Sequence, residues 1–242
     1  MPHSLKWNVR RQELINDTER NISMRPVNRG QQPEKLVITK YQDALPDLSE
    51  RFGRYCSYCE MQLSASLAVE HIMPKSKHPD LELKWENYLL SCVHCNSIKG
   101  NKDINVSDYF FPDRDNTFAI FDYSQKGIAV SNSLNPQDSE KAQKTLQLTG
   151  LDRLNENEKR FIDFTMKWNI ALRSRKRLNN NLSNVDIIES TIDLAKESGH
   201  FSIWMTVFAD NPDMKRRFIE AFPGTETRWF DENGNSKPSK SF

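Results

Sequence analysis

The pattern of apolar and polar residues predicts one helix and one β-hairpin before residue 135, outside the cysteine-rich centre of the chain. In residues 34–52, apolar residues recur mostly at intervals of three and four, which is typical of an amphipathic helix. Gly53 follows directly and would end that helix. Two short apolar runs, at 118–121 and 128–130, flank a turn at 124–127 and predict the hairpin.

From Asn135 onward the pattern has the period of helices. Asp138 can cap the first of them, and Asn155 with Glu158 resembles the capping box of a longer one. The apolar face of that longer helix would consist of Phe161, Phe164, Trp168 and Leu172. The expected helices cover 138–149, a long segment from 155, 185–198, 201–209, and a segment that begins at Asn211-Pro212 and ends before Pro223-Gly224.

These patterns predict an α+β fold in four parts. Residues 1–33 form an N-terminal extension and arm, in which Arg25 and Arg29 are expected to make surface salt bridges. Residues 34–134 form a mixed domain with a cysteine-rich centre and the hairpin, and residues 135–224 form a helical domain. Residues 225–242 form a polar tail, and we expect its last part, 231–242, to be mobile.

Composition indicates a soluble globular protein, because 37% of the residues are hydrophobic and 28% are charged. The sequence has no run of about 18 apolar residues, so we expect no membrane-spanning helix. The first residues do not resemble a secretory signal, so a cytoplasmic protein is expected. The net charge of +1 does not by itself indicate nucleic-acid binding. The basic run at 173–177 is interpreted equally well as a solvated helix face or as an edge that contacts phosphates.

All four cysteines lie in the central stretch, as the pairs Cys56/Cys59 and Cys92/Cys95. Each C-x-x-C pair can point two thiolates at one ion, and two pairs complete a closed, tetrahedral zinc site of structural type. In a reducing cytoplasm this arrangement favours metal over disulfides. His94 could compete as a ligand, but we expect it to face solvent.

The 32 residues between the two pairs must form a structured insertion. Residues 67–72 predict a short buried strand that carries Glu70 and His71 at its end, and residues 85–90 predict a second strand. A short helix would begin at Asn96 and end at Gly100. The insertion is therefore a ββα unit clamped at both ends by the zinc cysteines.

The residues of this unit resemble the HNH endonucleases that have a ββα-metal fold and zinc-binding cysteine pairs. The resemblance rests on three segments, Glu70-His71-Ile72-x-Pro74, Trp85-x-Asn87-x-Leu89-Leu90 and Cys92-x-x-Cys95-Asn96-x-x-Lys99-Gly100. The phrases MRPVNRG, RFGRYCSYCE and AVEHIMPKS and the helical C-terminal part are similar to one subfamily, PtuB, the HNH component of Septu and of retron systems that defend against phage.

The resemblance implies a catalytic role for each polar residue of the unit. His71 would be the general base, since an imidazole with a pKa of ~6.5 can accept a proton from water at cellular pH. Glu70 and Asn96 would bind a catalytic divalent metal, Mg²⁺ or Mn²⁺, both of which take oxygen ligands. Asn87 would hold the loop and orient His71, and Lys99 would contact the scissile phosphate or solvent. Asn96 departs from the commoner pattern, which has a second histidine at this position.

The function implied is metal-dependent hydrolysis of nucleic-acid phosphodiester bonds, leaving a 5′-phosphate and a 3′-hydroxyl. The resemblance also implies a partner, an ATPase of the PtuA type, and in retrons a reverse transcriptase with its multicopy single-stranded DNA; no membrane is involved. Two alternatives stay open at this point. The substrate could be RNA, such as a tRNA, or the chain could be a zinc-stabilised binding module with an inert site.

Overall fold

The structure is a computed structural model that describes residues 24–238, apart from 64, 66, 125–126, 154–156 and 182–183. The expectations for residues 1–23 and for Asn155 lie outside the described residues. The α-helices are α2 (Leu45–Phe52), α3 (Val93–Lys99), α4 (Pro136–Thr149), α5 (Lys159–Asn179), α6 (Val185–Ser198), α7 (Phe201–Val207) and α8 (Pro212–Ala221). The strands are β1 (Ala68–His71), β2 (Tyr88–Ser91), β3 (Phe121–Ser124) and β4 (Gly127–Val130). Short 3-10 helices lie at Tyr41–Ala44, Pro79–Leu81, Trp85–Asn87, Val106–Asp108, Thr117–Ala119, Leu151–Arg153 and Thr227–Trp229.

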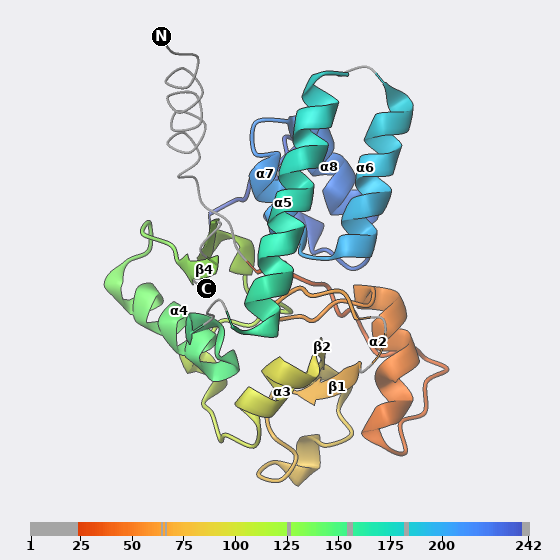
Figure 1. Cartoon of the computed structure of the whole chain (residues 1–242). Helices are drawn as coiled ribbons and strands as arrows, with labels where there is room; N and C mark the ends of the chain where they lie inside the picture. Colours follow the sequence, from red (N-terminus) through yellow and green to blue (C-terminus); the bar gives the residue numbers. More distant parts are fainter. Residues whose placement is uncertain are drawn as a thin grey trace.

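The expected α+β class is confirmed, with a ββα unit in the first part and helices in the second (Figure 1). β1 and β2 pair in antiparallel fashion, with His71 opposite Tyr88 and Glu70 opposite Leu89. α3 packs against β1 and α2 packs against β2. Since both faces of β2 are covered, all four of its residues are buried, including the polar Ser91.

The helix expected over 34–52 begins later, at Tyr41, with one 3-10 turn that leads into α2. The Asp43 carboxylate explains the start. It accepts hydrogen bonds from the backbone N–H groups of Thr39 (2.9 Å) and Lys40 (3.0 Å), so it caps the chain at that point.

Two strand boundaries also differ from the sequence expectation. Residues 85–87 form a 3-10 turn, and β2 begins only at Tyr88. The side chain of Asn87 bonds to the backbone of the preceding loop, and this holds the turn. The hairpin is likewise shifted, because residues 117–119 form a 3-10 turn before β3.

Two apolar cores meet in the molecule. The first contains the cysteines, β1, β2 and the buried residues of α2 and α4, and α4 packs with α3 and β4 rather than with α5 to α8. The second is formed by α5 to α8, which gather on the other side of the molecule in Figure 1. Among the described helices, none combines the length and the apolar character needed to cross a bilayer.

Within the helical part, α6 has the expected bounds, and two other expectations need correction. Asn135 rather than Asp138 caps α4, because the Asn135 side chain accepts from the Asp138 N–H at 2.9 Å. On α5, Phe164 and Trp168 are buried as expected, but the next buried position is Ala171 and Leu172 is 38% exposed. The inward face of a long helix drifts by one position because 3.6 residues complete each turn.

The basic run at 173–177 lies in the last turns of α5, at the end that points away from the ββα unit in Figure 1. Arg175 is used within the fold: it bonds to the Val207 carbonyl oxygen and pairs with Asp210 at 2.6 Å. Ser174 is buried, whereas Arg173 and its basic neighbours Lys176 and Arg177 are exposed. A solvated helix face therefore describes most of this run.

The tail after residue 224 packs on the body of the protein as far as the structure describes it, contrary to the expected mobility. Phe230 is buried in the second core. The Asn116 side chain donates to the Lys237 carbonyl oxygen at 2.6 Å, and Lys215 donates to Asn235 at 2.6 Å. The polar composition of the tail did not predict this packing, because the side chains that hold the tail come from distant parts of the chain.

The arm at 24–33 is also more integrated than expected. The Arg25 guanidinium is buried and donates to the carbonyl oxygens of Phe52 (2.7 Å) and Pro223 (2.7 Å) and to the Thr225 hydroxyl (3.1 Å). Burial lowers its pKa to about 10. Arg29 forms a salt bridge of 3.0 Å with the buried carboxylate of Asp113. The expected surface salt bridge is thus wrong for Arg25, whereas Arg29 does form a salt bridge, but with a carboxylate that is buried.

Arg25→Met should destabilise the protein, because three buried acceptors would lose their donor at once. We expect a loss of about 3 kcal/mol, which for a chain of this size lowers the melting temperature by roughly 6–12 °C. Arg173→Met, at an exposed position on α5, is the matched control and should change stability by less than about 0.5 kcal/mol. Thermal unfolding followed by circular dichroism checks both, and equal melting temperatures for the two variants would contradict the role of Arg25.

Candidate active site and metal centre

The four cysteine sulfurs converge at one point in the first core. All four side chains are buried, and their Sγ atoms lie within 4.8 Å of one another, with Cys59 and Cys92 at 3.8 Å. Tetrahedral zinc with Zn–S bonds of ~2.3 Å requires S···S separations of about 3.8 Å. The cluster therefore fits the predicted structural zinc ion in ligand type, number and spacing. Cys92 also caps α3, because its Sγ accepts from the Cys95 N–H at 3.4 Å.

A residue that the sequence did not indicate, Arg160 at the start of α5, contacts this cluster. Its guanidinium donates to Cys95 Sγ at 3.4 Å, to the Thr149 carbonyl oxygen at 2.9 Å and to the Gly150 carbonyl oxygen at 3.2 Å. Burial opposes the charge, but the ion pair with Glu158 and the Cys95 sulfur raise the pKa of Arg160. A fixed positive charge beside a zinc thiolate offsets part of the negative charge of a four-cysteine site.

Glu60, directly after Cys59, is a second residue that sequence reasoning missed. It has a positive φ of 60° and is buried. Its carboxylate accepts from the Arg25 N–H at 2.5 Å, the Ser202 N–H at 2.8 Å and the Ser202 hydroxyl at 2.6 Å. Burial raises the pKa of Glu60, and the two Ser202 bonds oppose that rise. The first cysteine turn is thereby tied to the N-terminus of α7.

His71 ends β1 and lies in a small aromatic frame. Its ring meets Tyr41 and Tyr88 edge-on, with ring centroids 5.0 and 5.2 Å away. Its Nε2 is 3.0 Å from the carbonyl oxygen of Glu82. A carbonyl oxygen only accepts, so Nε2 carries the proton and Nδ1 keeps the lone pair. Burial lowers the pKa of His71 below its usual value, which favours this neutral form.

Asn87 closes the loop that follows His71. Its Oδ1 accepts from the Met73 N–H at 2.7 Å, and its Nδ2 donates to the carbonyl oxygens of Met73 (2.9 Å) and Leu81 (3.2 Å). These bonds join both ends of the 72–84 loop, so they fix the Glu82 carbonyl that sets the His71 ring. The contacts hold the loop, and the role of Asn87 in orienting His71 stays a prediction.

Glu70 and Lys99 lie on the other face of β1 and form a buried ion pair. The Lys99 ammonium is 2.8 Å from Glu70 Oε1, with side chains 1% and 3% exposed, and it donates to the His71 carbonyl oxygen at 2.6 Å. Burial raises the pKa of Glu70 to about 7, although the Lys99 charge opposes the rise. Lys99 contacts neither solvent nor an accessible phosphate site here, so both expectations for it need correction. Alternation along a strand separates Glu70 from the His71 ring.

Asn96 lies one turn before Lys99 on α3, on the side of the helix that packs toward β1, and is half-buried. Glu70 Oε1 faces Lys99 but has no aligned hydrogen bond, which makes it a buried oxygen able to take a further ligand. One carboxylate oxygen and one amide oxygen are ligands that Mg²⁺ and Mn²⁺ accept. In donor chemistry the two residues therefore fit a divalent ion, although no described contact joins their side chains.

The other histidines of this region lie outside the site. His94 is exposed, as expected for a residue between two zinc ligands. His78 pairs with Asp103 at 2.9 Å on the surface. Lys75 lies at the open edge near His71, where its ammonium is 4.3 Å from the Tyr41 ring centre and 3.2 Å from Glu82 Oε1.

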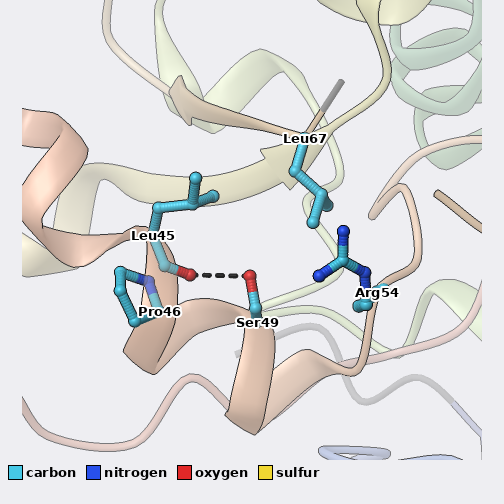
Figure 2. Close-up of a pocket in the computed structure, with 5 residues that line it drawn as sticks. All are labelled: Leu45, Pro46, Ser49, Arg54 and Leu67. Atoms are coloured by element: carbon cyan, nitrogen blue, oxygen red, sulfur yellow. Dashed lines mark hydrogen bonds between the residues drawn. The ribbon is translucent and has the colours of Figure 1, made fainter. Parts of the chain in front are cut away.

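A surface hollow beside α2 lies apart from these residues (Figure 2). Its polar groups are already used: Ser49 donates to the Leu45 carbonyl oxygen at 2.6 Å and Arg54 donates to the Leu63 carbonyl oxygen at 3.1 Å. It offers no candidate catalytic side chain. It is lined by Leu45, Pro46, Ser49, Arg54 and Leu67.

Comparison with known proteins agrees with this geometry. Residues 56–102 match the family model of the HNH endonucleases, which confirms that this segment is an HNH endonuclease domain. The chain is similar to the Septu protein PtuB of Bacillus thuringiensis, with 37% identity over 113 residues that make up 44% of this chain and 41% of that protein. The similarity thus spans about two fifths of that relative's length. No solved structure matches the chain.

Cys92→Ser should remove the bound zinc, because it deletes one of the four thiolate ligands. We expect the purified variant to contain far less than one zinc per chain by elemental analysis and to lose its cooperative thermal transition. His94→Ser, two residues further along the chain at an exposed position, should keep full zinc content. A soluble Cys92→Ser protein that still holds one zinc per chain would refute the four-thiolate site.

Proposed function

We propose that this protein is a metal-dependent endonuclease that hydrolyses phosphodiester bonds of nucleic acid. The observation that carries the proposal is the state of His71. Its Nε2 is held by the Glu82 carbonyl oxygen, its pKa is lowered by burial, and its Nδ1 is left to accept a proton. Together with the HNH domain match over residues 56–102, this supports a general base rather than a structural histidine.

In the reaction we propose, His71 Nδ1 takes a proton from a water molecule. The water oxygen attacks the phosphorus in line with the 3′-oxygen, the new P–O bond forms and the bond to the 3′-oxygen breaks. The departing oxygen gains a proton, so the products are a 5′-phosphate and a 3′-hydroxyl. A divalent ion bound by Glu70 and Asn96 would supply neutralisation of the charge that develops on the leaving oxygen.

The remaining residues of the site position the base. Asn87 fixes the 72–84 loop, and the Glu82 carbonyl oxygen fixes the tautomer and tilt of the His71 ring. Tyr41 and Tyr88 flank that ring and restrict its rotation. Lys75 adds a positive charge at the open edge, where it can attract a substrate phosphate.

We further propose that this nuclease acts in a cytoplasmic anti-phage defence complex. The similarity to the Septu protein PtuB supports this assignment. The partner would be an ATPase of the PtuA type, and in a retron a reverse transcriptase with its multicopy single-stranded DNA could join the complex. The helical part from α5 to α8 supplies surface for such a partner beyond the HNH domain.

His71→Ala should abolish cleavage while leaving the fold intact, because the ring makes edge contacts and one hydrogen bond but carries no part of the zinc site. We expect the rate to fall by about 10²–10⁴-fold in Mg²⁺ or Mn²⁺. Labelled DNA and RNA pools, incubated with the chain and its assembled partners, provide the assay, and the pool that is cut identifies the substrate.

His78→Ala is the matched control, since His78 lies on the surface, where it pairs with Asp103. It should cleave at the wild-type rate. In cells, protection against phage should be lost with His71→Ala and kept with His78→Ala. If His71→Ala protects cells fully and cuts as fast as wild type, the chain is instead a zinc-stabilised binding module.

A further inference from the structure

The Glu70–Lys99 pair has a property that a purely structural ion pair does not need. Both charges are almost completely removed from water, which is costly unless the geometry satisfies every polar atom. Here the aligned hydrogen bond of the Lys99 ammonium goes to the His71 carbonyl oxygen, and Glu70 Oε1 faces the ammonium without one. The carboxylate is therefore neutralised but not fully engaged.

Tyr58 is a second buried polar residue. Among the residues that the structure describes, its hydroxyl has no hydrogen-bond partner, although Tyr58 is 0% exposed. Burial raises the pKa of Tyr58 well above its usual value, and the charge of Glu70 raises it further. Glu70 Oε1 pairs with the Lys99 ammonium at 2.8 Å, so a divalent ion at this carboxylate would have to replace that ammonium.

We propose that Lys99 is an internal cation that holds Glu70 while no divalent ion is bound and leaves it when the ion arrives. This rests on the proposed function, which assigns Glu70 to that ion. An ammonium and a divalent ion within a few ångströms of one carboxylate repel each other, so they are alternative rather than simultaneous partners of Glu70.

Lys99 is built for such an exchange. It stands in the last turn of α3, directly before Gly100, which has a positive φ of 55° and ends the helix. Its four-carbon stem can swing the ammonium outward without movement of the helix backbone. Since the same ammonium donates to the His71 carbonyl oxygen, the exchange also releases the end of β1 that carries the candidate base.

Lysine footprinting of the wild-type chain tests the exchange directly. An amine-acylating reagent should leave Lys99 unmodified in the absence of divalent ions, because it is 1% exposed. Saturating Mn²⁺ should raise the labelling of Lys99 by about tenfold or more, measured by mass spectrometry of its peptide. Lys75, with its side chain 44% exposed, should be labelled in both conditions, and the buried Lys215 should be protected in both.

Mn²⁺ binding, followed by electron paramagnetic resonance at pH 8, gives an independent measurement. Lys99→Met removes the competing charge and should bind Mn²⁺ at least about tenfold more tightly than wild type. Lys99→Arg keeps the charge and should not gain affinity, and Glu70→Gln should lose the binding in either background. Zinc content and near-UV circular dichroism confirm that each variant is folded.

A merely structural role predicts the opposite sign, since loss of a structural lysine weakens the site it supports. Weaker or unchanged Mn²⁺ binding by folded Lys99→Met would overturn the proposal. So would Lys99 that stays protected while wild type binds Mn²⁺ through Glu70, and in that case the proposed nuclease function stands. If Glu70→Gln leaves Mn²⁺ binding unchanged, both this proposal and the assignment of Glu70 to the ion fail, whereas the His71→Ala assay still decides whether the chain is a nuclease.

Discussion

Convergence of four cysteine sulfurs within 4.8 Å is the constraint on which the rest of the structure depends. The two pairs close a loop of 32 residues, so both ends of the ββα unit are fixed at one point. A two-stranded sheet of four-residue strands has little stability of its own. The four-cysteine site holds this sheet at both ends, and α2 and α3 cover it. The sheet therefore presents His71 on one face and Glu70 on the other.

The four-cysteine site also joins the two cores of the protein. Arg160 extends from α5 to Cys95, and Glu60, beside Cys59, accepts bonds from Ser202 at the start of α7. Gly199 permits a further close approach: its φ is +68°, and a Cβ there would lie 2.8 Å from the Glu60 carbonyl oxygen. The helical part is therefore attached directly to the cysteine turns. A partner that moved these helices would act on the zinc site and, through α3, on β1.

The parts of the site that the sequence predicts are those whose signal is local. The cysteine spacing identifies the four-cysteine site, and the short apolar runs around Glu70-His71 identify β1 within a residue or two. The buried polar contacts were not predictable in this way. Arg160 lies 65 residues from Cys95, and Glu60 lies 142 residues from Ser202. A charged residue on an amphipathic helix or in a turn has the same sequence pattern whether its partner is water or a distant backbone.

Lys99 illustrates the same limit within the site itself, and it also explains how adjacent residues on a strand can serve one reaction. Periodicity places Lys99 and Asn96 on one side of α3, but it cannot say which of the two enters the core. The structure places the lysine there, against Glu70 and the His71 carbonyl oxygen. Although the side chains of Glu70 and His71 point apart, the ammonium contacts the carboxylate of one and the backbone of the other. Any event at Glu70 that moves Lys99 therefore reaches His71 through a single hydrogen bond.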